Sequence, residues 1–486
     1  MERPESPSYK SRASAWIGAL SVVATVVTAG WLFAGAPQLS RAPGWFYQWL
    51  DKGSLDMLLV AASTALLPVV VRTSFRWVRS RFWLAAGCVV VGSILVQLAA
   101  GVVARRDVRG WTDRFYVGHG EFTARTKTTP DALYLLRNYE QLAQQRQLGL
   151  YGPSKPPGTY AVYLLIDRTS RWPLVQALIG PLISIVARDP GIWPEDRPRI
   201  TWTIVVLCLC AAFTALPLCW LARALFPGVG ADERALLYPA WLFVSAPAIN
   251  VITVHLDSSV FPLLSATSTA LCAASVRAGT ARARGLLAAA GGGCGMFAVY
   301  CSYGNLPIFV MGAAVVLGMA LSQASWRAAI LPLLAAGAGA LSVLLLLRVA
   351  LNWQPLVGYA RGVAYHVQWR PNLPHAWRYG LAFLEFSLFA GPPLMLAFIA
   401  STLLALRDVK AVSGLRVLTL VAAALIVGIS LAFGTPEAAR LWLFMLPWIC
   451  CAVGAIFARS ESRGAFGMLL AGQLVLVLFV KNYLVW

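Results

Sequence analysis

The sequence predicts an all-α, polytopic helical membrane protein, and three observations support this fold class. Hydrophobic residues make up 59% of the 486 residues and charged residues only 12%, which is more apolar surface than one soluble core buries. The apolar residues form runs of about 17 to 25, the length that a helix needs to cross roughly 30 Å of hydrocarbon. Charges fall between these runs, and a helix satisfies its own backbone hydrogen bonds in lipid. We therefore expect about 13 transmembrane helices and a large outer-face loop carrying juxtamembrane helices.

The expected helices follow the apolar runs in chain order. They lie at 15–35, 55–71, 83–104, 200–222, 236–255, 258–276, 285–302, 306–323, 328–350, 380–406, 417–434, 441–458 and 464–481. The first run ends in Ala-Gly-Ala at 34–36, so a cleaved signal peptide is the alternative to a membrane anchor. The run is long for a signal peptide, and this length favours the anchor.

Basic residues alternate between the loops in a way that predicts topology. Lys10 and Arg12 precede the first helix, and every second loop carries a short basic cluster. The clusters are Arg72, Arg76, Arg79 and Arg81; Arg223 and Arg234; Arg277, Arg282 and Arg284; Arg327; Arg407, Lys410 and Arg416; and Arg459 and Arg463. Because cytoplasmic loops carry excess Lys and Arg, we expect a multi-pass protein with a cytoplasmic N-terminus.

Topology also accounts for the net charge of +20, so nucleic acid is not an expected partner. The nine cysteines lie mostly inside apolar runs, without a CxxC pair or a Cys/His ligand spacing. This placement is typical of small buried side chains. We therefore expect no metal and no cofactor, while membrane lipids are expected partners; the sequence does not indicate an oligomeric state.

Three parts are expected along the chain. Residues 1–82 form the N-terminal tail and an added transmembrane hairpin, 83–350 the core with the outer loop 105–199, and 351–486 the C-terminal helices with the outer loop 351–379. The loop 105–199 is the stretch of ordinary soluble composition. Its segment DALYLLRNYEQLAQQ (131–145) has helical apolar spacing and predicts a helix on the membrane surface.

Two further segments of this loop are apolar but unsuited to crossing a bilayer. TYAVYLLI (159–166) is too short, and RWPLVQALIGPLISIVA (171–187) contains two prolines. We expect both to lie along the outer leaflet or to dip into it. Counting either as a span would also invert the side of every later arginine cluster.

The segment GPSKPPG (152–158) predicts a rigid corner. Pro156 and Pro157 fix φ and remove two amide donors, and the proline after Lys155 favours an extended conformation for that lysine. Gly158 then allows the chain to turn back toward the bilayer. The alternative is a simple interfacial turn without a function.

Ionisable residues gather on the side opposite to the basic clusters. They comprise the four histidines His119, His255, His366 and His375, together with Asp257, Glu385, Glu437 and Arg440. Such groups at membrane depth cost a few kcal/mol unless they are paired or solvated, which predicts a wet cavity open to the outer face. The alternatives are helix capping by His255 and Asp257, interfacial anchoring by Arg440, and helix bridging by Glu385.

The start of the large loop combines carboxylates with arginines. Asp113 and Glu121 lie among several basic residues, including Arg114. A carboxylate there could serve as general base for an acceptor hydroxyl while guanidinium groups hold a phosphate. A solvated run of charges is the alternative interpretation.

Three motifs, in this order, resemble a known family. SKPPG (154–158), HLDSSVFPLL (255–264) and GTPEAARLWLFMLPW (434–448) resemble motifs of the GT-C superfamily, the polyprenyl-phosphate-sugar-dependent membrane glycosyltransferases. The resemblance is greatest to bacterial relatives of the protein mannosyltransferases. It implies transfer of a sugar from a polyprenyl-phosphate donor to a lipid, glycan or protein acceptor, by metal-independent inverting displacement on the outer face of a bacterial plasma membrane.

The resemblance also implies roles for particular residues. Glu121 best matches the catalytic loop acid and Asp113 is second; Asp257 matches the later aspartate, and Glu437 and Arg440 match the Glu-x-x-Arg motif. Donor-phosphate binding is expected from Arg440, Lys155 and Arg114, with His119, His255 and Glu385 as further residues of the cavity. Lys155 stands where the family has histidine, and a lysine does not replace a neutral imidazole as acid or base near pH 7.

A transporter or a flippase for lipid-linked glycans is the alternative function. Such a protein is expected to have internal repeats, interrupted helices and polar groups near the centre of the bilayer. The sequence instead places its polar groups at one face, next to a loop rich in acids and arginines. This distribution favours the glycosyltransferase.

Overall fold

The computed structural model describes fourteen stretches of the chain. They are residues 7–34, 48–49, 67–77, 81–103, 120–129, 131–149, 152–187, 191–226, 233–251, 255–368, 375–407, 412–433, 438–460 and 462–485. These stretches are predominantly helical, and a two-residue antiparallel pairing joins β1 (Gln48–Trp49) to β2 (Leu484–Val485). The all-α membrane fold class is confirmed.

Twelve helices occupy most of the predicted apolar runs. They are α1 (Pro7–Phe33), α5 (Phe82–Val103), α12 (Arg197–Phe213), α13 (Ala215–Leu225), α16 (Val260–Arg277), α17 (Ala281–Cys301), α18 (Pro307–Ser322), α19 (Ile330–Leu351), α22 (Pro392–Arg407), α23 (Gly414–Phe433), α25 (Leu446–Ser460) and α26 (Arg463–Tyr483). Shorter helices are α4 (Leu67–Trp77), α7 (Gly120–Thr128), α8 (Ala132–Arg137), α9 (Tyr139–Gln144), α10 (Pro157–Ser170), α11 (Pro173–Val186), α14 (Tyr238–Val244), α15 (Pro247–Val251), α20 (Pro355–Gln368), α21 (His375–Ala390) and α24 (Ala438–Leu441). Short 3-10 turns are η1 (Gly152–Ser154), η2 (Pro194–Asp196), η3 (Glu233–Leu237), η4 (Tyr303–Asn305), η5 (Trp326–Ala329) and η6 (Leu443–Met445).

The number of membrane-spanning helices is smaller than expected. Eight helices of the described chain are long and apolar enough to cross a membrane, or nine if the bent pair α21–α22 counts as one span. The expectation of about 13 spans is therefore too high for the described residues. Most of the predicted run at 55–71 lies outside them.

Breaks within the apolar runs explain part of the difference. The run at 236–255 divides before Pro247 into α14 and α15, because proline lacks the amide donor that a continuous helix needs. The side-chain amide of Asn250 donates to the carbonyl oxygens of Val244 at 2.8 Å and Ala246 at 2.9 Å. These bonds compensate carbonyls at the break, which lowers the cost of interrupting the helix inside the protein. In the run at 441–458, the 3-10 turn η6 precedes a shorter apolar helix.

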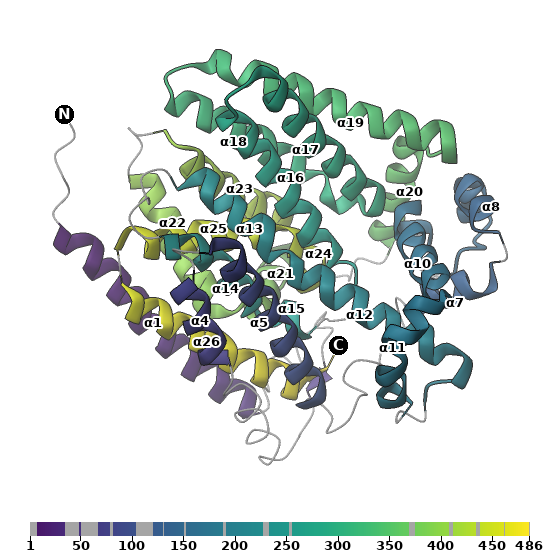
Figure 1. Ribbon diagram of the computed structural model, residues 1–486, viewed down its shortest axis with the longest axis horizontal. Coiled ribbons are helices and arrows are strands. Elements are labelled where there is room, and N and C mark those ends of the chain that lie inside the picture. Colours follow the sequence, from purple (N-terminus) through teal and green to yellow (C-terminus); the bar gives the residue numbers. More distant parts are fainter. Residues whose placement is uncertain are drawn as a thin grey trace.

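Helix α17 is not among the eight candidate spans, because its hydropathy is too low. It has 21 residues, but its Ala- and Gly-rich sequence lowers its hydropathy. The same small residues let α17 lie directly against α19, as Figure 1 shows. A Cβ on Gly292 would lie 1.9 Å from the carbonyl oxygen of Ala336, and one on Gly339 would lie 2.0 Å from that of Ala289. Close backbone approach through small residues is typical of helix packing in membranes.

The bend between α21 and α22 measures 110° and depends on Gly391. Gly391 has φ +101°, a conformation that residues with a side chain rarely adopt. Gln473 of α26 secures the bend, since its side-chain amide donates to the carbonyl oxygen of Ala390 at 3.0 Å. The predicted run at 380–406 is therefore two helices rather than one straight span.

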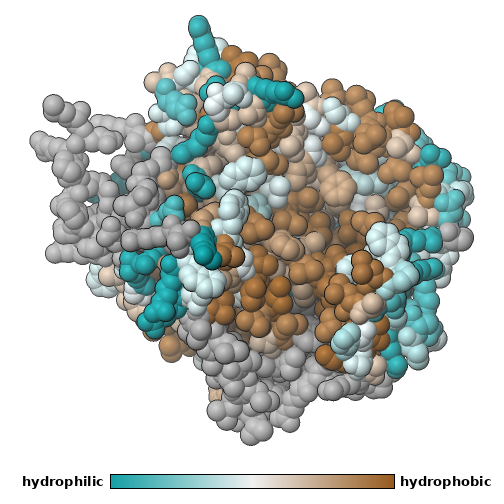
Figure 2. Space-filling view, viewed as in Figure 1, coloured by the Kyte–Doolittle hydropathy of each residue, from teal (hydrophilic) through white to brown (hydrophobic). Residues whose placement is uncertain are grey.

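Buried tryptophans form hydrogen bonds between helices in the core of the bundle. Trp241 of α14 donates to Ser74 Oγ at 3.1 Å, and Trp448 of α25 donates to Thr269 Oγ1 of α16 at 3.0 Å. Both indoles are fully buried and keep a hydrogen-bond partner, as buried tryptophans require. Figure 2 shows a broad hydrophobic surface across the visible face, with hydrophilic side chains toward its left and right edges. This distribution fits a bundle surrounded by lipid.

The described part of the large loop gathers α7, α8, α10 and α11 at one end of the molecule (Figure 1). The helix predicted at 131–145 is confirmed but is divided at Asn138 into α8 and α9. Asp131 is its N-cap and accepts from the amides of Leu133 and Tyr134. Helices α10 and α11 have 14 residues each, too few to span, as expected. Helix α11 continues through Pro181, although the prolines suggested a break.

Candidate functional site

The corner at GPSKPPG connects the surface helices to α10. After η1, Lys155 lies between the turn and Pro156, which is the N-cap of α10 with φ −78° and ψ 165°. Pro157 is the first helical residue, a position where the missing amide donor would have no partner in the helix. The predicted turn is confirmed, and its prolines begin the following helix.

Hydrogen bonds from other elements hold this corner. The Tyr139 hydroxyl lies 2.8 Å from the carbonyl oxygens of both Gly152 and Lys155 and donates to them. Arg361 of α20 donates through Nε to the carbonyl oxygen of Pro153 at 2.9 Å and forms an ion pair with Glu140. The corner is therefore bound to α9 and α20, as a rigid element would be.

Gly158 brings α10 into close contact with the C-terminal end of α17. A Cβ at this position would lie 2.2 Å from the carbonyl oxygen of Tyr300. Next to it, Thr159 Oγ1 donates to the carbonyl oxygen of Cys301 at 2.6 Å. The glycine is thus required by close packing against the bundle.

Asp257 and Arg440 form a buried ion pair. Arg440 Nε of α24 is 3.3 Å from Asp257 Oδ2, and the two side chains are only 4% and 3% exposed. Asp257 lies in the turn before α16, where Ser258 and Ser259 donate their hydroxyls to the carbonyl oxygen of His255. An isolated charge at such depth would cost several kcal/mol, so each side chain depends on the other. The structure therefore brings together two of the motifs singled out in the sequence.

Tyr163 of α10 lies near enough to the pair for both charges to affect its pKa. Burial raises the pKa of Tyr163, the nearby charge of Asp257 raises that pKa further, and Arg440 lowers it. The phenol is therefore neutral at physiological pH and can exchange hydrogen bonds without a change in charge. Tyr163 was not predicted as a site residue from the sequence; its signal is the Tyr160 and Tyr163 spacing on one face of a helix that starts at the proline corner.

Aromatic packing places α7 beside the same group. The ring of Phe122 is stacked 6.0 Å from that of Tyr163 and meets the ring of Tyr160 edge-on at 4.9 Å. Glu121 precedes Phe122 on α7, so its backbone lies next to the helix that faces the ion pair. The side chain of Glu121 lies outside the described residues, as do Asp113, Arg114, His119 and Glu437.

Lys155 lines a cavity of about 240 Å³. Lys155 is buried, and Ser302, Tyr303, Tyr359 and Trp442 are among the other residues that line the cavity. No carboxylate is among the lining residues in the described part of the chain. This volume suits one sugar ring better than a drug-sized ligand of several rings.

The Lys155 cavity and the Asp257–Arg440 ion pair both include residues of the segment at α24. Trp442 lines the cavity and lies two residues after Arg440. Helix α21 packs on α24, and the ring of Phe386 lies 5.5 Å from that of Trp442. Glu385, the preceding residue, is 2% exposed on this same helix. The predicted cavity residues Lys155, Asp257, Glu385 and Arg440 thus belong to neighbouring elements at one end of the bundle, with His255 in the turn of Asp257.

A search among the described residues finds no group of three His, Cys, Asp or Glu side chains placed to hold a metal ion. No protein-family model matches this chain, and no curated protein sequence matches it. The fold and the site define the protein as an all-α membrane protein with a buried Asp–Arg pair beside a lysine-lined cavity.

Proposed function

We propose that the protein is an integral membrane glycosyltransferase that moves a sugar from a polyprenyl-phosphate donor to a lipid, glycan or protein acceptor. The observation that carries the proposal is the Asp257–Arg440 pair beside Tyr163 and the Lys155 cavity. A transferase of this kind needs cations for a leaving phosphate and a shaped space for one sugar, next to lipid. We propose that this site lies on the outer face, as the basic clusters predict, of a bacterial plasma membrane, as the resemblance implies.

The proposed role of the cations is to stabilise the leaving group. Asp257 orients Arg440 through Nε, and a fixed guanidinium is well suited to a phosphate oxygen. Lys155 contributes the second positive charge from the cavity wall. With two cations on the phosphate, the proposed reaction proceeds without a metal ion. Arg114 is a further candidate ligand.

The proposed base is Glu121, with Asp113 as the second candidate. The carboxylate removes the proton of the acceptor hydroxyl, whose oxygen then attacks the anomeric carbon. The bond from that carbon to the phosphate oxygen breaks, so polyprenyl phosphate leaves and the anomeric configuration inverts. The packing of Phe122 against Tyr163 supports this assignment, because it keeps α7 close to the cations.

We also propose that shorter elements complete the membrane domain. The bent pair α21–α22 would form a ninth span, and α17 and the segment η6–α25 would lie among the spans within the bilayer. The cytoplasmic side would then carry the N-terminus and the basic clusters.

A flippase or transporter is the second candidate, and one observation favours it. The helix pairs α14–α15 and α21–α22 are interrupted, the first at Ser245 and Ala246 and the second at Gly391, in the pair that carries Glu385. Interrupted helices that point toward a polar site are typical of transporters.

A reconstituted transfer assay tests the proposal. Proteoliposomes receive radiolabelled polyprenyl-phosphate sugars, and transfer by the wild type is compared with Glu121→Gln and Asp113→Asn. We expect a loss of about 100-fold or more for the variant of the base. Glu195→Gln, which changes an exposed carboxylate of the same loop, is the control and should retain activity.

Two results would contradict this function. Full activity in both loop variants removes the base assignment. Absence of transfer from every such donor, together with movement of the labelled lipid across the bilayer, identifies the flippase instead.

A further inference from the structure

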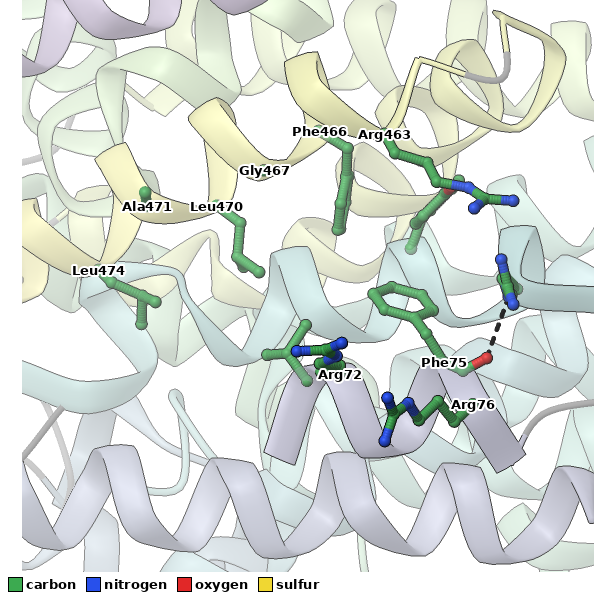
Figure 3. A pocket seen from close by; sticks show the side chains of 12 residues that line it. Arg72, Phe75, Arg76, Arg463, Phe466, Gly467, Leu470, Ala471 and Leu474 are labelled. Carbon is green, nitrogen blue, oxygen red and sulfur yellow. Dashed lines mark hydrogen bonds between the residues drawn. The ribbon is translucent and has the colours of Figure 1, made fainter. Parts of the chain in front are cut away.

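A second pocket, of about 540 Å³, lies between α4 and α26 (Figure 3). Four arginines line it, and we call it the arginine pocket: Arg72 and Arg76 of α4, Arg234 of η3, and Arg463 at the start of α26. It is separate from the site described above and does not depend on the proposed function.

The charge in the arginine pocket is of one sign. No Asp or Glu is among its lining residues in the part of the chain that the structure describes. Arg72 and Arg76 are exposed and lie one helical turn apart, an arrangement in which like charges repel. Arg234 is held by a hydrogen bond from its Nε to the carbonyl oxygen of Phe75 at 3.0 Å. An anion that binds among these guanidinium groups would relieve the repulsion.

The rest of the arginine pocket is apolar. Phe75, Tyr238 and Phe466 pack with ring centroids 4.3 to 6.2 Å apart and form its middle. Leu470 and Leu474 continue this surface along one face of α26. In Figure 3, Arg76 and Arg463 lie at one end, Leu474 lies at the other, and the two phenylalanine rings lie between them.

The position along α26 relates these two ends to the bilayer. Arg463 is the first residue of the candidate span Arg463–Lys481. Leu470 and Leu474 therefore lie about 10 and 17 Å further along the helix axis, at the depth of acyl chains. Gly467 and Ala471, which also line the pocket, are exposed, so its wall is not covered by other described elements.

We propose that the arginine pocket binds an anionic phospholipid of the surrounding leaflet, which the basic clusters predict to be the cytoplasmic one. The lipid phosphate lies among Arg72, Arg76 and Arg463, and an acyl chain follows α26 past Leu470 and Leu474. Basic pockets between helices on the cytoplasmic side suit such head groups. The apolar wall selects a lipid over a soluble phosphate, which has nothing to place there.

Native mass spectrometry of the full-length protein tests this proposal. The protein is extracted from nanodiscs that contain equal amounts of phosphatidylglycerol and phosphatidylcholine, and retained lipids are counted. We expect selective retention of phosphatidylglycerol by the wild type. The triple variant Arg72→Gln, Arg76→Gln and Arg463→Gln should weaken retention on the order of a hundredfold, because each basic side chain near the surface contributes about fivefold.

Two further variants separate the pocket from general charge and from misfolding. Arg277→Gln, Arg282→Gln and Arg327→Gln remove the same charge from the same predicted face outside the pocket, and retention should persist. Ala471→Trp keeps all four arginines but fills the groove for the acyl chain, and retention should fall. Its thermal unfolding midpoint is measured in parallel to show that the variant is folded.

Three results would overturn the proposal. They are equal retention of the two lipids by the wild type, an equal loss in the control triple variant, and displacement of the lipid by millimolar inorganic phosphate. The last result would identify a site for a soluble anion.

Discussion

Basic side chains lie in different environments at the two ends of α26. At one end, Arg463 belongs to the exposed arginine pocket; at the other, Lys481 donates to the carbonyl oxygen of Val251 at 2.9 Å, a few residues before the turn of Asp257. The two ends are about 27 Å apart along the helix axis, close to the thickness of the hydrocarbon core. The same helix thus carries a partly buried, hydrogen-bonded cation at one end and an exposed cation at the other.

The difference shows what burial requires of a charged side chain. Arg440 is 4% exposed and is matched by a carboxylate, because an unpaired charge there would cost several kcal/mol. Arg72 and Arg76 are exposed, and no carboxylate lines their pocket in the described part of the chain. Water solvates these exposed charges and salt screens them, so the arginines do not need a carboxylate partner and can bind an external anion. Position, rather than residue type, separates a structural arginine from a ligand-binding one.

Breaking the buried pair should have the largest effect. Arg440→Met leaves the Asp257 carboxylate buried without its cation, and we expect a loss of about 3–5 kcal/mol in the free energy of unfolding. Arg76→Met, at the exposed site, should change that free energy by less than about 0.5 kcal/mol. Denaturant unfolding in a mild detergent measures both.

The double variant Asp257→Leu with Arg440→Met is the control for this prediction. It removes both charges, so much of the lost stability should return. An Arg440→Met variant as stable as Arg76→Met would contradict the account of the pair.

Two glycines sharpen the comparison between a tight and an open environment. Gly391→Ala places a side chain at φ +101° and its Cβ 1.7 Å from Gln473 Oε1, so we expect a loss of about 1–3 kcal/mol. Gly467 lines the arginine pocket, and a Cβ there meets nothing within 4 Å. Since alanine favours the helix, Gly467→Ala should gain about 0.5–1 kcal/mol. Thermal unfolding of the two variants should therefore shift in opposite directions, and a shift in the same direction would refute the prediction.

The smallest effect is expected at the proline corner. Tyr139→Phe removes the hydroxyl that donates to Gly152 and Lys155, and we expect a loss of about 1 kcal/mol at neutral pH. Burial raises the pKa of Tyr139 well above its ordinary value of 10.0. The stability from this group is therefore present below about pH 10 and lost as pH rises through the raised pKa, because the unfolded state releases its proton first.

Unfolding measured from pH 7 to pH 11 checks this dependence. The wild type should lose stability above about pH 10 more steeply than Tyr139→Phe. Tyr134→Phe, an exposed tyrosine of the same segment, is the control and should follow the wild type. Parallel curves for the wild type and Tyr139→Phe would contradict the assignment.

Much of the fold and part of the site followed from local sequence features. Apolar runs predicted the spanning helices, and the apolar spacing after Asp131 predicted a surface helix that the structure divides at Asn138. The count of spans was too high because run length does not reveal a break such as the one before Pro247 or the bend at Gly391. For the site, Asp257 and Arg440 were singled out as separate candidates, but their contact was not predicted.

The sequence by itself determined that this is a helical membrane protein with basic clusters between apolar runs and a proline corner before α10. These properties depend on neighbouring residues, because hydropathy and proline geometry act within one or two turns. Only the tertiary structure decided that Arg440 meets Asp257, that Tyr163 lies near them, and that Gln473 secures the bend at Gly391. Those contacts join segments far apart in the chain, and their energies come from desolvation and packing that no local pattern records.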